Sequence, residues 1–421
     1  MKTNTAEIQK FSSYQIQLLI CIAGLLFTMV LDFMLLPAIS AMVMPALDLS
    51  TSQFGYVVSA YSISAGTSAL IFSTFADRFE RKRLLLFIYT GFLIGILFSA
   101  LAQGFWMLIA ARVFTGIFGG VVAAICYAMV SEIFSLQQRG RAMGSLHVAF
   151  ALCQVLGLPA AIFIASRYQW QVAYFVTLST GLLFYVLSLF IIKPITGHLK
   201  EQSNVSSKLK GIVTTHSYWF VFANNFTIVI ADVLFMTFAS VFYVKNQLIS
   251  DDELAIVFGA SGIATILLSP LIGKLADKTS HFKVFAIGTG IAATMVLTIS
   301  QLHEAGIIWV VVCNTLLFTG MAARMICSGA LGLEIPKSTD RASFMTFDSA
   351  LQLICAGMAA TAAGWIVFQD EDGKMLNYPI LSIIVVLLMG ITLFFMLKIS
   401  RKATSSNSPK NEHAPDPDGS P

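Results

Sequence analysis

Residues 18–44 read LLICIAGLLFTMVLDFMLLPAISAMVM, an apolar stretch in which Asp32 is the one charged side chain. A helix crosses the roughly 30 Å hydrocarbon core of a bilayer with about 20 residues, so this stretch is long enough to span a membrane. It is too long for the apolar core of a signal peptide, and no small-residue cleavage site follows it. We therefore expect residues 15–44 to form an uncleaved first membrane-spanning helix.

The composition of the whole chain agrees with a membrane protein. Of its 421 residues, 57% are hydrophobic and only 11% are charged, and the mean hydropathy is +0.80. A soluble domain covers its surface with roughly 25% charged residues. So few charges could not hydrate a soluble protein of 45.8 kDa, whereas the hydrocarbon core needs no polar surface.

Apolar segments of the required length recur along the chain. We expect spans at 15–44, 53–74, 84–103, 106–131, 143–165, 172–192, 217–244, 254–273, 283–301, 307–333, 343–368 and 378–398. In lipid each backbone group must bond within its own segment, and these runs lack the alternation of a barrel strand. The predicted fold class is therefore all-α transmembrane, with twelve helices.

The basic residues predict the orientation of these spans. If the N-terminus is cytoplasmic, 21 of the 26 Lys and Arg residues lie in cytoplasmic segments, and only Arg167, Lys245 and Lys374 lie on the other side. Cytoplasmic loops carry such an excess of Lys and Arg. We expect a multi-pass protein of the cell inner (plasma) membrane with both termini in the cytoplasm.

An internal repeat divides the chain. Asp32 and Asp232 lie 200 residues apart, as do the tripeptides 76–78 (ADR) and 276–278 (ADK). Glu132 with Arg139 recurs as Glu334 with Arg341 at an offset of 202. Repeated halves place a transporter's substrate site near the bilayer midplane, between the repeats. We predict an N-terminal six-helix half at 1–192, a cytoplasmic linker at 193–216, a C-terminal half at 217–398 and a disordered cytoplasmic tail at 399–421.

Several short motifs resemble those of the major facilitator superfamily. Residues 73–83 (STFADRFERKR) are similar to its motif A, with Ser73 and Glu80 where glycines are usual, and residues 273–278 (GKLADK) repeat it. Residues 108–120 resemble motif B through Arg112, and 157–159 (GLP) resemble part of the antiporter motif C. The sequence looks closest to bacterial twelve-span drug:proton antiporters and sugar-efflux permeases. This resemblance implies two pseudo-symmetric six-helix bundles and secondary transport by alternating access.

Two acids and one arginine are candidates for proton coupling. A carboxylate at the bilayer centre costs roughly 2.5–3.5 kcal/mol on insertion scales, so Asp32 and Asp232 should face the bundle interior. Burial disfavours the charged form, as a site that loads and unloads protons requires. Arg112 resembles the motif B arginine that modulates proton release. A structural acid bonded to neighbouring helices is the alternative for both aspartates.

A second group of polar residues is expected in or near a substrate cavity. Arg324 lies near mid-membrane and either contacts substrate or pairs with Asp232. The candidate hydrogen-bonding residues are Asn224, Asn225, Gln154, Asn314 and Gln352. Asp348, near the cytoplasmic end of its span, is expected to cap a helix or to lie in solvent. The glycines 116, 119, 120 and 157 indicate close packing of the fourth and fifth spans.

The motif A residues should lie at the cytoplasmic surface. By resemblance, Asp77, Arg78 and Arg81, with Asp277 and Lys278 in the second copy, form a latch that holds the halves together in one conformation. A basic loop that only fixes topology is the alternative.

The expected function is secondary transport, most simply proton-coupled efflux of a small molecule. Proton-coupled uptake or facilitated diffusion is the alternative within this class, and a membrane-embedded receptor or enzyme is the alternative outside it. The sequence has no phosphate-binding G-x-x-x-x-G-K-[ST] loop, nucleophile elbow, metal cluster or nucleic-acid module. We expect no cofactor and no enzymatic activity. The expected partners are a substrate, protons and lipid, with the protein a monomer.

Overall fold

The structure, a computed structural model, describes residues 10–197, 211–212, 214–302, 306–336 and 341–407. Within these residues, twelve helical segments are long and apolar enough to cross a membrane. The middle of the predicted linker, 198–210, and the end of the predicted tail lie outside the described residues. The prediction of a twelve-helix membrane protein is confirmed.

The N-terminal part of the chain contributes six of these segments. The first is α1 (Ser13–Ala38) with the short α2 (Ser40–Ala46), followed by α3 (Thr51–Ser73), α4 (Arg81–Ala100) and α5 (Phe105–Ile133). The fifth consists of α6 (Leu136–Leu152), one π-helical turn (Cys153–Gly157) and α7 (Leu158–Arg167), and α8 (Trp170–Ile191) completes the set. A 3-10 turn (Ala76–Arg78) connects α3 to α4.

The C-terminal part repeats this order. It comprises α10 (His216–Met236) with α11 (Ala239–Lys245), α12 (Asp251–Lys278), α13 (His281–Gln301), α14 (Gly306–Gly332), α15 (Arg341–Ile366) and α16 (Tyr378–Asn407). A two-stranded antiparallel hairpin, β1 (Phe368–Gln369) and β2 (Met375–Leu376), lies between α15 and α16. The last helix continues nine residues beyond its predicted end at 398, so the first part of the predicted tail is helical.

Local signals explain several helix starts, and they follow the repeat. Ser50 and Gln53 form a capping box before α3, and Ser250 and Glu253 form the same box before α12, 200 residues later. In each box a serine side chain and an N3 side chain satisfy backbone N–H groups that have no helical partner. The same local structure therefore recurs at the 200-residue spacing of the sequence repeat.

Three predicted spans are interrupted. The first helix ends at Ala38, one residue after Pro37, which has no N–H to continue the hydrogen-bond ladder. The equivalent break after Met236 has no proline, and the fifth span contains the π turn. Irregular turns at these places shift the faces that the following helices present.

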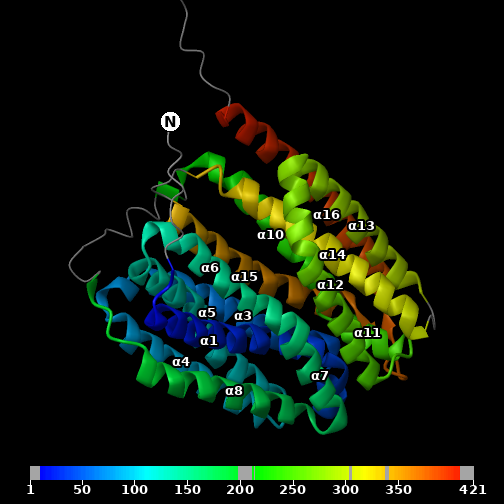
Figure 1. Cartoon of the computed structure of the whole chain (residues 1–421). Helices are drawn as coiled ribbons and strands as arrows, with labels where there is room; N and C mark the ends of the chain where they lie inside the picture. Colours follow the sequence, from blue (N-terminus) through cyan, green and yellow to red (C-terminus); the bar gives the residue numbers. More distant parts are fainter. Residues whose placement is uncertain (1–9, 198–210, 213, 303–305, 337–340, 408–421) are drawn as a thin grey trace, which may run out of the picture.

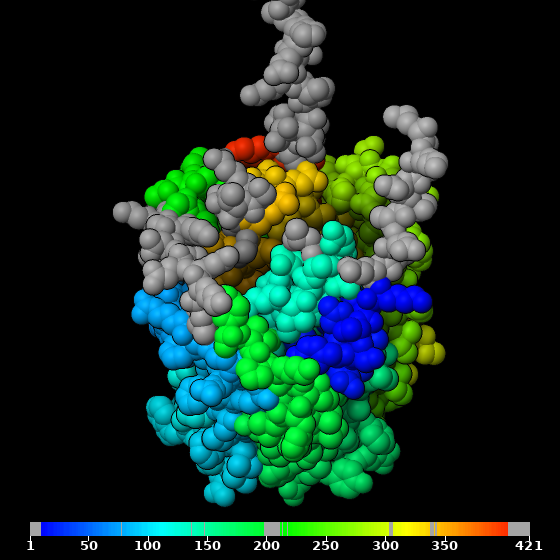
Figure 2. All heavy atoms as spheres, turned by 60° about the vertical axis from the view of Figure 1, so that its left-hand side comes forward, coloured from blue at the N-terminus to red at the C-terminus, as the bar shows by residue number. Residues whose placement is uncertain are grey.

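The helices form two groups side by side, with α15 of the second group packed along α3 of the first (Figure 1). We call the end of the molecule that holds the start of α1, the end of α8 and the end of α16 the termini face. Figure 2 turns this end toward the viewer, and α6 (cyan) lies there between the start of α1 (blue) and the start of α15 (orange). The other end is called the opposite face.

Candidate functional site

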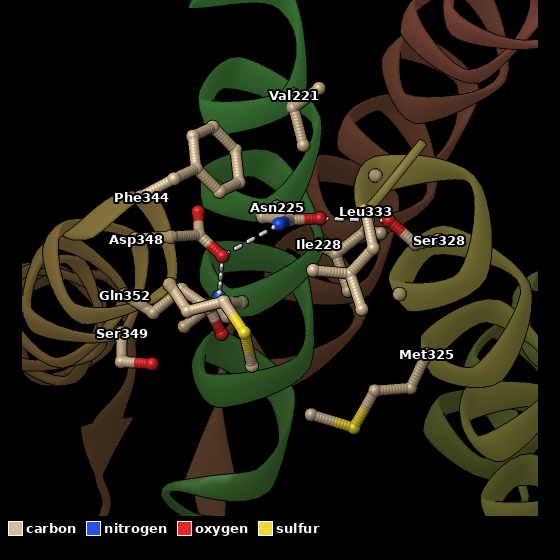
Figure 3. A pocket seen from close by; sticks show the side chains of 14 residues that line it. Val221, Asn225, Ile228, Met325, Ser328, Leu333, Phe344, Asp348, Ser349 and Gln352 are labelled. Atoms are coloured by element: carbon tan, nitrogen blue, oxygen red, sulfur yellow. Dashed lines mark hydrogen bonds between the residues drawn. The ribbon is translucent and has the colours of Figure 1, made fainter. Parts of the chain in front are cut away.

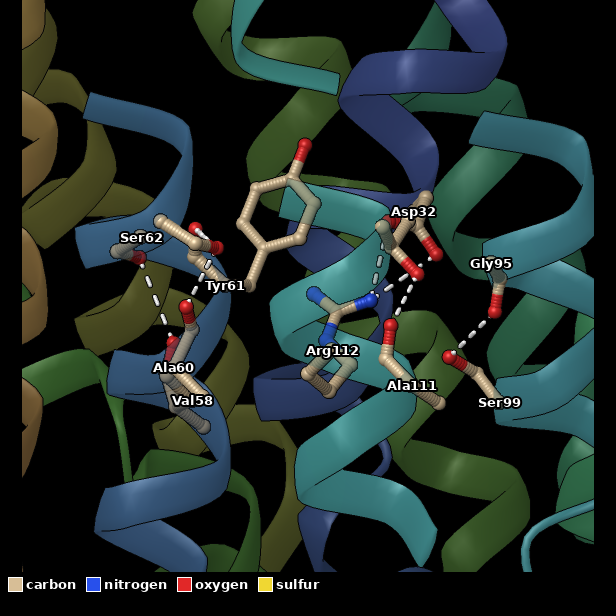
Figure 4. A network of polar contacts seen from close by, with 11 residues as sticks. Asp32, Val58, Ala60, Tyr61, Ser62, Gly95, Ser99, Ala111 and Arg112 are labelled. Carbon is tan, nitrogen blue, oxygen red and sulfur yellow. Dashed lines mark hydrogen bonds and ion pairs between the residues drawn. The ribbon is translucent and has the colours of Figure 1, made fainter. Parts of the chain in front are cut away.

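The most buried charges of the N-terminal group form an ion pair between α1 and α5. Nη1 of Arg112 donates to both carboxylate oxygens of Asp32, at 3.1 Å (Oδ1) and 3.0 Å (Oδ2). The exposed side-chain fraction is 0% for Asp32 and 2% for Arg112. The guanidinium also lies 4.4 Å from the centre of the Tyr61 ring, on α3 (Figure 4). Three helices thus enclose one acid and one cation that neutralise each other.

A second ion pair links α10 and α14. Nη1 of Arg324 donates to Oδ1 of Asp232 at 2.7 Å. Arg324 is fully buried, whereas 20% of the Asp232 side chain is exposed. Of the two hypotheses for Arg324, this contact matches the pairing with Asp232. Its Nε and Nη2 are buried without a hydrogen-bond partner among the described residues.

The two pairs are not built from equivalent positions. At the offset of 202, Arg112 corresponds to Asn314, which donates to Oγ of Ser261 at 2.7 Å and accepts from the Tyr243 hydroxyl at 2.8 Å. Ser261 in turn corresponds to Tyr61 at the offset of 200. The C-terminal group therefore has a neutral network where the N-terminal group has its arginine, and its own arginine lies ten residues further along α14.

A cavity of about 220 Å³ lies between α10, α14 and α15 (Figure 3). It is lined by the first half of α10, the end of α14 and the start of α15, so it lies toward the termini face. Two of the predicted residues, Asn225 and Gln352, line it and donate to Oδ2 of Asp348 at 2.9 and 2.7 Å. The expectation that Asp348 caps a helix is wrong, whereas its partly exposed side chain in the cavity wall does not contradict contact with solvent. Asp348 lies two turns inside α15, where it accepts from Asn225 of α10 and from Gln352 one turn later on α15.

The other predicted amides are distributed around the molecule. Asn224 is buried behind the cavity and donates to Oγ of Ser328 at 2.7 Å, while Asn314 lies in the separate network described above. Gln154 lies in the π turn. Its backbone carbonyl oxygen comes so close to Gly262 of α12 that a Cβ atom added at that glycine would be 2.6 Å away. The five amides therefore do not form one site.

The motif A region holds the start of α4 to neighbouring segments. Nε of Arg81 lies 2.7 Å from Oε1 of Glu132 at the end of α5, and both side chains are largely buried. The carboxylate of Glu80 accepts from the N–H groups of Lys82, Arg83 and Ile195, so it caps α4 and fixes the chain after α8. Burial acts to raise the pKa of the Glu80 carboxyl, but these N–H groups outweigh it and lower that pKa below its usual value. The roles of Glu80 and Glu132 were missed, although the departure of Glu80 from motif A was visible.

The remaining latch residues are exposed or outside the description. Arg78 and Lys278 are exposed, and Asp277, 75% exposed, lies 3.5 Å from His281 one turn later. The backbone of Asp77 forms part of the 3-10 turn, and its side chain lies outside the described residues. The latch therefore stays a prediction.

The two groups are joined by polar contacts toward the opposite face. Arg167 of α7 pairs with Asp252 of α12 at 2.9 Å, and the Trp365 indole donates to the Tyr56 hydroxyl at 2.9 Å. Oγ of Ser52 donates to the carbonyl of Gly364 at 3.0 Å. On this side Gly55 allows α3 to approach α15 so closely that a Cβ atom there would lie 2.7 Å from the Ala360 carbonyl oxygen. Gly66, nearer the termini face, approaches the Ala350 carbonyl oxygen in the same way, at 2.6 Å from such a Cβ atom. The structure is therefore closed between the groups on the opposite face.

The sequence profile of the Major Facilitator Superfamily matches residues 21–347 and again 221–417. The chain belongs to this superfamily. The second match begins near the start of α10, as expected if the C-terminal part repeats the N-terminal part. The relatives and the solved structures that resemble this chain are transporters and not enzymes.

Three curated relatives illustrate the range of similarity. The chain is 34% identical over 125 residues to the vacuolar membrane amino acid uptake transporter fnx2 of Schizosaccharomyces pombe, covering 30% of this chain but only 22% of that protein. It is 25% identical to the uncharacterized MFS-type transporter YceJ of Bacillus subtilis, over 63% of this chain and 68% of that one. It is 24% identical to a probable sugar efflux transporter of Helicobacter pylori, over 70% and 75%.

Solved structures show the same fold. A bacterial homologue of the human lysosomal transporter Spinster, in an inward-facing and occupied conformation, matches with a TM-score of 0.74 at 14% identity. The match covers 95% of this chain and 100% of that one. The nucleoside transporter NupG (D323A mutant) matches with a TM-score of 0.72 at 12% identity, covering 92% and 100%.

Proposed function

We propose that this transporter is a proton-coupled antiporter that exports a small organic molecule from the cytoplasm across the cell inner (plasma) membrane. The basic residues gather on segments of the termini face, and by the positive-inside rule this supports a cytoplasmic position for that face. The halves 1–192 and 217–398 then move against each other around a central site, and the segment between them acts as a linker.

The observation that carries the proposal is the buried pair of Asp32 and Arg112. A carboxylate with no exposed surface stays charged only while its cation is in place. If the helices separate the two groups during the transport cycle, Asp32 must take up a proton or remain as an unpaired buried charge. Separation and protonation are therefore linked, which is what coupling requires.

The proposed direction of substrate transport follows from the conformation in which Asp32 and Arg112 are paired. The structure is closed on the opposite face and has Asp32 paired with Arg112, and we take the paired acid to be the deprotonated form. We assign this state to the cytoplasm-facing protein after it has released its proton. Substrate would bind in this state, and protonation from the outside would favour its release there. An inward proton gradient would then drive export.

Uptake or facilitated diffusion is the competing function. The curated relatives include an amino acid uptake transporter as well as a probable sugar efflux transporter. A proton that binds together with substrate would use the same Asp32–Arg112 pair for import. The sign of substrate movement under a pH gradient separates these functions.

The test uses proteoliposomes and substrates found by a thermal-shift screen of the purified protein. We impose a pH gradient with the higher proton concentration on the side of the opposite face. We expect it to drive substrate out of the compartment that faces the termini side. Asp32→Asn should abolish this driven flux while exchange of substrate without a gradient persists. Asp372→Asn, an exposed acid between β1 and β2, is the matched control. Undiminished driven flux in Asp32→Asn would refute the proposed proton site.

A further inference from the structure

The cavity between α10, α14 and α15 contains a carboxylate that no cation within the described part of the chain neutralises. Among the described residues, Asp348 forms no ion pair with Lys, Arg or His, and its Oδ1 has no hydrogen-bond partner. In Figure 3 that oxygen points toward the Phe344 ring, while Oδ2 receives the two amides. This acid differs from Asp32 and Asp232, each of which has its own arginine.

A chain of hydrogen bonds supports the negative charge of Asp348. Asn224 donates to Ser328 Oγ, the Ser328 hydroxyl donates to Oδ1 of Asn225, and Asn225 donates to Asp348 Oδ2, at 2.7, 2.7 and 2.9 Å. Each hydrogen bond of this series is donated in the direction of the Asp348 carboxylate, and an ionised carboxylate is an acceptor only. Hydrogen bonds aligned in one direction polarise and strengthen one another. The network therefore favours an anionic Asp348, for which the described residues supply no counter-charge.

The fold does not require this polar network. At the repeat offsets of 200 and 202, the positions equivalent to Asn225, Ser328, Asp348 and Gln352 hold Leu25, Cys126, Leu146 and Phe150. The first three are buried in the hydrophobic core of the N-terminal group, and Phe150 packs against that core. One half thus fills this place with apolar side chains, while the other leaves a cavity with an acid in its wall.

The rest of the cavity wall suits an apolar body. Val221, Ile228, Met325, Leu333 and Phe344 line it. The Phe344 ring is held by stacking on Phe222 with ring centres 4.7 Å apart, and Tyr218 contacts it edge-on at 5.3 Å. Aromatic faces attract organic cations, and methionine adapts to irregular apolar surfaces.

We propose that this cavity binds a lipophilic organic cation, with the ammonium group at Asp348 and the apolar body against Phe344 and Met325. The inference deepens the proposed function, because it names the substrate class of the exporter. The carboxylate supplies the charge, and Asn225 and Gln352 hold it in position. Because the cavity lies toward the termini face, the cation would enter from the cytoplasm or the adjoining lipid leaflet.

The test is equilibrium binding of radiolabelled 2-phenylethylamine to the full chain in lipid nanodiscs, with no pH gradient. The comparison probes are 2-phenylethanol, neutral and of similar shape, and phenylacetate, an anion. Since a hydrogen bond to a charged group contributes about 1.5–3 kcal/mol, we expect the amine to bind roughly 10- to 100-fold more tightly than the alcohol. Phenylacetate should not compete.

Three variants make the test specific. Asp348→Asn keeps the size of the side chain, and Asp348→Leu copies the residue of the N-terminal half. Both should remove the preference for the amine while the alcohol binds unchanged or better. Asp372→Asn should bind like the unaltered protein. Equal affinity for amine and alcohol, failure of the amine to bind, or amine binding by Asp348→Asn at full affinity would each overturn the proposal.

The result is separable from that for proton coupling. Asp32→Asn should keep the preference for the amine over the alcohol, because that preference depends on Asp348, although it loses driven flux. Loss of the cation site with intact gradient-driven flux of another solute would refute only the substrate class. Intact amine binding with no driven flux in the unaltered protein would refute only the antiport function.

Discussion

The two buried ion pairs should differ in how strongly their members are coupled. Asp32 and Arg112 are both almost without exposed surface, and one guanidinium nitrogen contacts both carboxylate oxygens. Asp232 is 20% exposed and makes a single contact of 2.7 Å with Arg324. Two parallel double-mutant cycles, with Asp→Asn and Arg→Met at each pair, compare these environments within one protein.

The expected magnitudes follow from burial. Removing one member of a fully buried pair leaves an unneutralised charge, which costs about 3–5 kcal/mol, whereas replacing both removes the need for neutralisation. For Asp32 and Arg112 we expect each single change to cost about that much and a coupling energy near 3 kcal/mol. At Asp232 water reaches the carboxylate, so we expect single changes nearer 2 kcal/mol and a coupling energy of about 1–2 kcal/mol.

The assay is reversible unfolding in mixed micelles, with the free energy of unfolding measured for all seven proteins of the two cycles, which share the unaltered protein. Substrate binding, or 2-phenylethylamine binding, is measured on the same samples. A coupling energy below about 0.5 kcal/mol at Asp32 and Arg112 would mean that the pair is not the energetic unit described. Equal coupling at both pairs would refute the dependence on burial.

Four further outcomes are expected. Arg324→Lys should preserve the charge opposite Asp232 and leave substrate affinity within about threefold, because the pairing accounts for Arg324; a larger loss of affinity with normal stability would restore a substrate role. Glu80→Gln should destabilise the protein by about 1 kcal/mol at neutral pH. Because the pKa of Glu80 is lowered on folding, its contribution is complete above the unfolded pKa of 4.5 and disappears as the pH falls through the lower folded value, so melting curves of the two proteins should converge in acid. Gly66→Ala should destabilise the protein by about 1–3 kcal/mol, since its methyl group would meet the backbone of α15, whereas Gly290→Ala, with open space around it, should be neutral or stabilising; equal effects would contradict this packing. Asp77→Ala should shift the distances between spin labels on the two sides of the molecule more than Asp277→Ala does, and unchanged distances in Asp77→Ala would exclude the latch.

The membrane-spanning helices were predictable because the length and apolarity of a span are local properties. A stretch such as 18–44 fixes the presence of a helix whatever its neighbours are. The interruptions inside spans were less accessible. Pro37 offers a signal for the break at Ile39, and Pro159, which has no N–H to bond one turn back, marks an irregularity at the π turn Cys153–Gly157 without specifying its form. The break after Met236 has no proline.

The partners of helix faces could not be predicted in the same way. The expectation that the glycines of the fourth span face the fifth is wrong: Gly116 and Gly120 approach Tyr61 and Ala65 of α3. Small residues show that a backbone comes close, yet they carry no information about which backbone it is. Asp348 was misjudged for a similar reason, because its distance from the end of the span was known but its neighbours on α10 were not.

The comparison of the halves shows which polar features the fold needs. Both halves place an acid at the same point of their first helix and neutralise it with an arginine from their fourth, although the two arginines come from different turns. An intramembrane carboxylate needs a cation, so this relation persists when the position of the cation changes. Asp348 has no such partner among the described residues, and the other half fills the equivalent place with Leu146. Asp348 is therefore an acid without a described counter-charge at a place that the other half fills with a leucine, and a cationic substrate supplies a functional reason for it.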